Sequence, residues 1–120
     1  MSKPLALIVE DDPQLGEIFS YALQSDFAAE LVDDGAAALS RLAEATPSII
    51  VLDLNLPGAS GRDILAFIKA ENRLAGARVI LTTADALQAE LLENQADIVL
   101  LKPISPAQLR QLASRMSLGI

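Results

Sequence analysis

The 120-residue sequence contains no cysteine, no histidine and no tryptophan, and its aromatic residues are one tyrosine and three phenylalanines. The lack of cysteine excludes disulfides, thiolate nucleophiles and thiolate metal sites. The lack of histidine removes the commonest general base and the imidazole metal ligand. A functional site in this chain must therefore be built from carboxylates, hydroxyls, lysine and the backbone.

Long hydrophobic runs are also missing, although 52% of the residues are apolar. No uninterrupted apolar stretch approaches the roughly 18 residues of a membrane span. Residues 1–4 lead straight into a short strand-like run and lack the pattern of a signal peptide. We therefore expect a cytoplasmic protein without membrane association, folded as one domain over residues 1–120.

Basic residues are scarce, nine against sixteen acidic ones, and the net charge is -7. Because non-specific affinity for nucleic acid comes mainly from Lys and Arg that neutralise phosphates, we expect no direct nucleic-acid binding. Most of the acidic excess is typical of a feature that maintains solubility.

Short apolar runs alternate with amphipathic segments along the chain, which predicts an α/β fold. The expected strands cover residues 5–9, 27–32, 48–53, 77–82 and 97–101, each followed by a helix. Joined by short loops, they imply a doubly wound (βα)5 flavodoxin-like sandwich with a parallel five-stranded sheet in the order 2-1-3-4-5. This order comes from fold rules and would place the first strand beside the third.

Caps and apolar spacing locate the helices between these strands. Asp12 is a predicted N-cap, with Pro13 as the first residue of the first helix. The fourth helix is expected to place Leu87 and Leu91 on its inner face. It should end near Asn94, a residue type that tolerates the left-handed conformation of a helix end.

Polar side chains close four of the predicted strands. Glu10 and Asp11 follow the first strand, Asp53 closes the third, Thr83 follows the fourth and Lys102 follows the fifth. Because the carboxyl ends of parallel strands meet at one edge, these side chains should lie together. Three neighbouring carboxylates repel one another unless a cation lies among them, and oxygen-only ligation suits Mg²⁺.

This residue set predicts a phosphoryl acceptor. An aspartate can form an aspartyl-phosphate, while a metal ion and an ammonium offset the charge on the transferring group. Each residue alone has a simpler interpretation: an acidic helix start, a turn residue, a capping threonine or a solvated lysine. Their joint occurrence at the ends of four strands favours the functional site.

Four motifs resemble those of the receiver domain of two-component response regulators. They are Ile8-Val9-Glu10-Asp11-Asp12, Val51-Leu52-Asp53-Leu54-Asn55-Leu56-Pro57-Gly58, Leu81-Thr82-Thr83-Ala84 and Leu101-Lys102-Pro103, in order and across the whole chain. The resemblance implies that a sensor histidine kinase or a histidine phosphotransfer protein donates the phosphoryl group. The domain would then switch conformation to regulate a downstream partner or effector domain, as a signalling phosphoacceptor and not as an enzyme.

The resemblance also assigns metal and acceptor roles. Asp53 resembles the phosphoacceptor and Asp11 a direct Mg²⁺ ligand. Glu10 resembles an acid that reaches the metal through water, and Asn55 the residue whose backbone carbonyl completes the protein ligands. Asn55 also matches one of two positions that tune hydrolysis of the aspartyl-phosphate.

Further roles follow from the later motifs. Thr83 resembles the switch hydroxyl that turns toward the phosphoryl oxygens, and Lys102 the lysine that pairs with them. Ala84 fits a small residue that leaves the phosphoryl group open to attack. Asp85 matches the second position that tunes hydrolysis, so a bulky apolar residue there should lengthen the phosphorylated lifetime. Pro103 matches a position that commonly follows a cis peptide bond.

Val99 departs from the pattern of the family, which usually has Tyr or Phe three residues before the lysine. The ring that swings inward as the threonine moves is therefore absent, and the neighbours Ile98 and Leu100 are aliphatic. Transmission through the surface of the fourth helix, fifth strand and fifth helix should be atypical.

Two other functions compete with this prediction. One is a docking module that keeps the receiver fold and works without phosphorylation, which Val99 favours and the complete site opposes. The other is a small phosphatase, which would need an acid two residues after the nucleophile, where Asn55 stands. The sequence leaves open the cognate kinase, the downstream partner, an effector domain after Ile120 and the formation of a homodimer.

Overall fold

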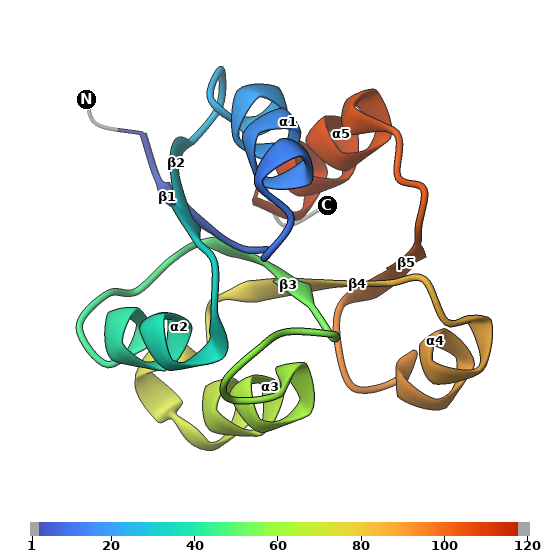
Figure 1. Cartoon of the computed structure of the whole chain (residues 1–120). Helices are drawn as coiled ribbons and strands as arrows, with labels where there is room; N and C mark the ends of the chain where they lie inside the picture. The colour runs from blue at the N-terminus through green and yellow to red at the C-terminus, as the bar shows by residue number, and fades with distance from the viewer. Residues whose placement is uncertain (1–2, 118–120) are drawn as a thin grey trace.

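The computed structural model describes residues 3–117 and has three layers, a parallel sheet between two layers of helices (Figure 1). The sheet has the order β2-β1-β3-β4-β5, and all neighbouring pairs are parallel. Both the predicted fold class and the predicted strand order are confirmed. The strands are β1 (Leu5–Val9), β2 (Ala28–Val32), β3 (Ile49–Asp53), β4 (Arg78–Thr83) and β5 (Ile98–Leu101), each starting within one residue of its predicted start.

Five α-helices cover the sheet. In Figure 1, α1 and α5 lie on one face, and α2, α3 and α4 lie on the other. A short 3-10 helix, η1, follows α3 and was not predicted. The bounds are α1 (Pro13–Leu23), α2 (Gly35–Leu42), α3 (Gly61–Ala70), η1 (Asn72–Leu74), α4 (Ala86–Leu92) and α5 (Pro106–Ser117).

The core is divided by the sheet into two clusters, because successive strand residues point to opposite faces. Ile50 of β3 packs in one cluster with Ile64 of α3. Its neighbour Val51 packs in the other cluster with Phe19 of α1. All five residues of β3 are buried, which explains why its sequence is apolar until the final aspartate.

The predicted inner face of α4 is wrong. Leu87 and Leu91 are 64% and 63% exposed, and Leu92 is the buried residue of this helix. The physical reason lies at the start of the helix, where Gln88 bonds to Thr83 of β4 and so turns its own side toward the sheet. Leu92, one turn further on, then faces inward.

The end of α4 also differs from the prediction. The helix ends at Leu92, and no residue other than glycine has a positive φ in residues 3–117, so Asn94 is not left-handed.

Within residues 3–117, no helix is both long and apolar enough to cross a membrane.

Candidate functional site

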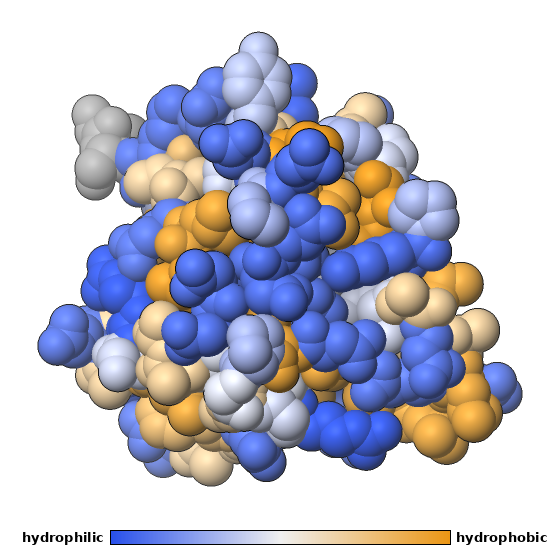
Figure 2. All heavy atoms as spheres, viewed as in Figure 1, coloured by the Kyte–Doolittle hydropathy of each residue, from blue (hydrophilic) through white to orange (hydrophobic). Residues whose placement is uncertain are grey.

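The candidate site lies at the carboxyl edge of the sheet, where β1, β3 and β5 end. Asp53 is the last residue of β3 and Glu10 directly follows β1, its neighbour in the sheet. Both residues are buried, with 2% exposure each. Figure 2 shows hydrophilic residues gathered over the middle of this face of the molecule and hydrophobic residues at its lower right, over α4.

Three carboxylates meet at this edge. Glu10, Asp11 and Asp53 each place one oxygen so that the three oxygens lie within 4.8 Å of one another. Asp11 is exposed, so the cluster is reachable from solvent on that side. Because hard divalent cations prefer carboxylate oxygens and repulsion among the carboxylates favours a cation, this donor set fits a metal ion.

Backbone N–H groups hold the two buried carboxylates in place. Glu10 Oε2 accepts from the N–H of Asp12 at 3.1 Å, and Asp53 Oδ1 accepts from the N–H of Asn55 at 3.0 Å. The predicted cap of α1 is confirmed, because the Asp12 carboxylate accepts from two backbone N–H groups and Pro13 begins the helix. The Asp12 side chain therefore caps α1, while its backbone N–H holds Glu10 of the cluster.

Lys102 joins the end of β5 to the acidic cluster. Its Nζ lies 3.0 Å from Glu10 Oε1 and 3.2 Å from Asp53 Oδ2. The side chain reaches past β4, since β4 lies between β5 and β3 in the sheet. The peptide bond between Lys102 and Pro103 is cis, as predicted.

Burial and the neighbouring charges shift the pKa values of Glu10 and Lys102. Burial, together with the charge of Asp53, raises the pKa of Glu10 against the opposing hydrogen bonds from Asp12 and Lys102. Burial by itself would lower the pKa of Lys102, but its hydrogen bond to Glu10 and the charge of Asp53 outweigh this and raise it. Lys102 therefore remains an ammonium ion among the carboxylates.

Thr83 is fully buried, and its hydroxyl is bonded to the start of α4. Its Oγ1 donates to Gln88 Oε1 at 2.9 Å and accepts from the N–H of Asp85 at 3.1 Å. Asp85 is the N-cap of α4, and its Oδ1 accepts from the N–H groups of Leu87 and Gln88. The predicted switch hydroxyl thus has partners outside the acidic cluster, and Ala84, between these residues, is exposed.

Sequence reasoning missed two polar residues near the site. Gln88 could have been found, because a cap residue followed three positions later by Gln is the capping-box spacing. The hydroxyl of Thr82 is buried without a hydrogen-bond partner, and its backbone is in register with Asp53. An alternating strand pattern gives no signal for such a group, since threonine is an ordinary strand residue.

The loop after β3 packs closely on the start of α2. Gly58 has a φ of 78°, which glycine adopts readily, and the N–H of Gly35 donates to the carbonyl oxygen of Pro57 at 3.0 Å. A Cβ on Gly35 would lie 2.0 Å from the carbonyl oxygen of Ala59. The loop that begins at Asp53 is therefore fixed to α2 by backbone contact.

Val99, at the position where an aromatic ring was expected from the resemblance, lies beside a surface hollow. It is partly buried against the core, and it lines a surface hollow of about 360 Å³ between α4 and β5. No aromatic residue lines this hollow.

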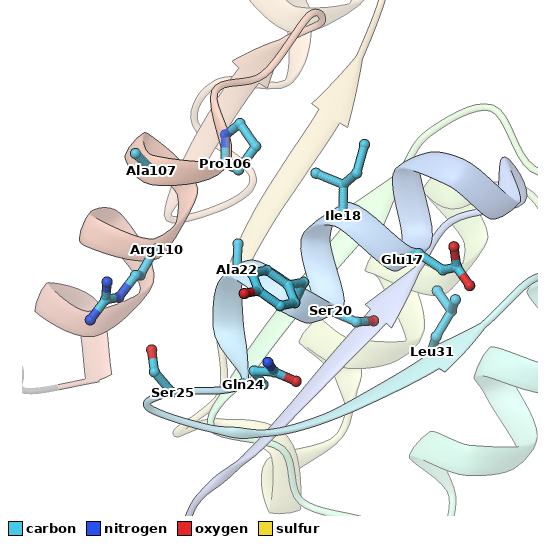
Figure 3. Close-up of a pocket in the computed structure, with 11 residues that line it drawn as sticks. Glu17, Ile18, Ser20, Ala22, Gln24, Ser25, Leu31, Pro106, Ala107 and Arg110 are labelled. Carbon is cyan, nitrogen blue, oxygen red and sulfur yellow. The ribbon is translucent and has the colours of Figure 1, made fainter.

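A larger groove of about 900 Å³ lies between α1 and α5 (Figure 3). Its lining includes Ile18, Tyr21 and Leu31, all exposed apolar or aromatic side chains, and Arg110 from α5. No residue of the acidic cluster lines it, so the chemistry of the cluster takes place elsewhere.

Comparison with known proteins finds a matching family model and relatives that are response regulators or histidine kinases. A family model described as the response regulator receiver domain matches residues 6–114. The chain is 35% identical over 107 residues to the DNA-binding response regulator MtrA of Mycolicibacterium smegmatis, covering 86% of the chain and 46% of MtrA. It is 30% identical over 117 residues to the sensor histidine kinase TmoS of Ectopseudomonas mendocina, covering 95% of the chain and 12% of TmoS.

Among solved structures, the BeF3-activated receiver domain of DrrB, a response regulator of Thermotoga maritima, is similar. The TM-score is 0.85 at 26% identity, covering 95% of the chain and 97% of that structure. The chain spans about half the length of MtrA and a small part of TmoS. In these relatives the similar segment is one part of a longer protein.

Proposed function

Because the chain belongs to the response regulator receiver domain family of two-component signalling, we infer that it accepts a phosphoryl group on Asp53. The observation that carries this proposal is the environment of Asp53. Its carboxylate is buried at a strand end, in contact with the Lys102 ammonium and beside two further acids. A buried carboxylate with a fixed cation beside it is prepared to gain negative charge.

The transfer step needs few groups from the protein. One oxygen of Asp53 forms a bond to the phosphorus of a phosphohistidine, the phosphorus–nitrogen bond breaks, and the imidazole leaves with that electron pair. Lys102 stays in place and offsets the charge of the new phosphoryl oxygens. The backbone N–H of Asn55 keeps the other carboxylate oxygen oriented.

We propose Mg²⁺ as the metal ion of this site, held by Asp11, Asp53 and the backbone carbonyl of Asn55, with Glu10 reaching the ion through water. The proposal is supported by the oxygen-only donors and by the exposure of Asp11, which leaves room for water ligands. When bound, the ion supplies positive charge that offsets the carboxylates and the phosphoryl oxygens.

The proposed phosphoryl donor is a sensor histidine kinase or a histidine phosphotransfer protein, and the proposed recipient of the signal is a downstream effector. Residues 1–120 form the receiver unit in this proposal, with the cytoplasm as its location. The net charge of -7 argues that nucleic-acid contacts, if the whole protein makes them, belong to another segment.

The proposal is tested with acetyl phosphate and Mg²⁺, followed by a phosphate-affinity gel. We expect a hydroxylamine-labile adduct on the wild-type chain and none on Asp53→Asn, because the amide is not a nucleophile. Asp63→Asn, which makes the same change on α3, should leave the adduct unaffected. No adduct on the wild type, or an adduct that survives Asp53→Asn, contradicts the proposal.

A docking module that works without phosphorylation is a second candidate, favoured by Val99 and the hollow beside it. It predicts that a partner captured by the wild type binds Asp53→Asn equally well, with or without acetyl phosphate. A partner whose affinity depends on the adduct would instead support the phosphoacceptor function.

A further inference from the structure

We propose that Gln88 is a positioning residue that holds the Thr83 hydroxyl at the start of α4 until a phosphoryl group on Asp53 draws it away. The inference rests on the proposed function and adds a hydrogen-bond partner for Thr83. It is carried by the hydrogen bond from Thr83 Oγ1 to Gln88 Oε1, 2.9 Å long.

The arrangement is an altered capping box. In the usual form, the Gln three residues after the N-cap accepts the backbone N–H of the cap residue. Here the N–H of Asp85 donates to Thr83 Oγ1 instead, and the Thr83 hydroxyl donates a hydrogen bond to Gln88 Oε1. The threonine hydroxyl is therefore inserted between the two ends of the box.

A hydroxyl has one proton, so Thr83 cannot donate to Gln88 and to a phosphoryl oxygen at once. The two acceptors compete, and turning toward Asp53 breaks both bonds to the start of α4. The N–H of Asp85 and the Oε1 of Gln88 are then free to bond each other, which restores the ordinary capping box. The helix start thus has two hydrogen-bonded arrangements, and the phosphoryl group favours the second.

Burial determines which of the two arrangements is destabilised more when the Gln88 acceptor is removed. Thr83 is 0% exposed, so a hydroxyl that lost Gln88 would have no water to replace it. Asp85 is exposed, and water can satisfy its N–H after Thr83 leaves. Removing the Gln88 acceptor therefore penalises the resting arrangement more than the switched one.

The consequence reaches the surface of α4. Leu92 is the buried residue of this seven-residue helix, so its first turn is held by the Asp85 cap and by the bonds to Thr83. Leu87 lies in that turn and is 64% exposed. With Val99 in place of a ring, this hydrogen bond gives a direct connection from Thr83 to an exposed apolar side chain.

The test measures the affinity of the whole chain for beryllofluoride, a stand-in for the phosphoryl group, in the presence of Mg²⁺. We expect Gln88→Met, of similar length but without the amide acceptor, to bind about 2- to 10-fold more tightly than the wild type. Gln88→Ala should shift the affinity in the same direction. Gln111→Met on the exposed face of α5 is the matched control and should bind like the wild type.

The same substitution in a chain that carries Thr83→Val distinguishes a positioning role of Gln88 from an effect on general stability. If Gln88 acts through the hydroxyl, Gln88→Met should have no effect in a chain that already carries Thr83→Val. An unchanged or weaker affinity of Gln88→Met, or an equal gain in the Thr83→Val background, overturns the inference. A wild-type chain that binds no beryllofluoride and forms no adduct overturns the proposed function, and this inference with it.

Discussion

Glu10 and Lys102 show at the residue scale how this site balances charge. Glu10 is almost fully buried, and it meets the ammonium of Lys102 at 3.0 Å and the carboxylate of Asp53 in the same cluster. The ammonium compensates part of the negative charge, yet the pKa of Glu10 is still raised, with burial as the largest cause. Without a further cation, the folded protein therefore holds the Glu10 proton more tightly than the unfolded chain.

This shift predicts a pH dependence of stability in EDTA. As the pH rises from about 4.5, the ordinary value for this carboxyl, through its raised folded pKa, the wild type should lose stability relative to Glu10→Gln. The sign follows because the folded state binds more protons than the unfolded state in that window. The measurement is the difference in unfolding free energy between the two proteins, from urea titrations at several pH values.

Saturating Mg²⁺ serves as the control for this prediction. A cation beside Glu10 favours the charged carboxylate. The loss of wild-type stability with rising pH, relative to Glu10→Gln, should therefore disappear or reverse. If the difference in unfolding free energy between the two proteins is independent of pH in EDTA, or if it grows in favour of the wild type as the pH rises, the raised pKa of Glu10 is contradicted.

At the scale of secondary-structure elements, the loop after β3 packs against the start of α2. Gly35 begins α2 directly beneath the loop that starts at Asp53, and only a residue without a side chain fits against the carbonyl of Ala59. The same loop carries Asn55, whose backbone orients the Asp53 carboxylate. The position of α2 and the geometry of the acceptor are thereby coupled.

Gly35→Ala should destabilise the fold by about 1–3 kcal/mol, because the added methyl group overpacks a backbone contact that cannot move freely. Urea unfolding measures the change. Gly76→Ala is the matched control, since nothing lies within 4 Å of its added Cβ, and its effect should stay within about 0.5 kcal/mol. Equal stability of the two variants would contradict the close packing of the loop on α2.

Sequence reasoning located the strands well and the contacts of α4 poorly. The end of β3 was predictable because apolar runs, turn residues and parallel pairing are encoded locally, and the strand ends then bring Asp53 and Lys102 together. The inner face of α4 was not, since Leu87 and Leu91 fit a helical repeat equally well in several rotations. In the observed rotation Gln88 bonds to Thr83 and Leu92 is buried, and both contacts depend on tertiary packing.

The whole molecule should gain stability from Mg²⁺ if the proposed site is correct, because the three carboxylates of that site come together only in the folded state. At a free concentration 100 times the Kd, the gain in unfolding free energy is about 2.7 kcal/mol. Thermal unfolding with and without Mg²⁺ measures it. Asp11→Asn should lose most of the gain, whereas Glu44→Gln, an equal change of charge on an exposed residue, should keep it. A gain of the same size in all three proteins would contradict a specific site.

The bond between Lys102 and Glu10 has a consequence for synthesis on the ribosome. The two residues are 92 positions apart, and β5, which leads to Lys102, is the last strand to be made and lies at the edge of the sheet. The nascent chain thus acquires its carboxylates well before the ammonium that compensates them. A translation product that stops before residue 102 would carry the acids without their counter-charge, so the site becomes balanced only once β5 and Lys102 have been made.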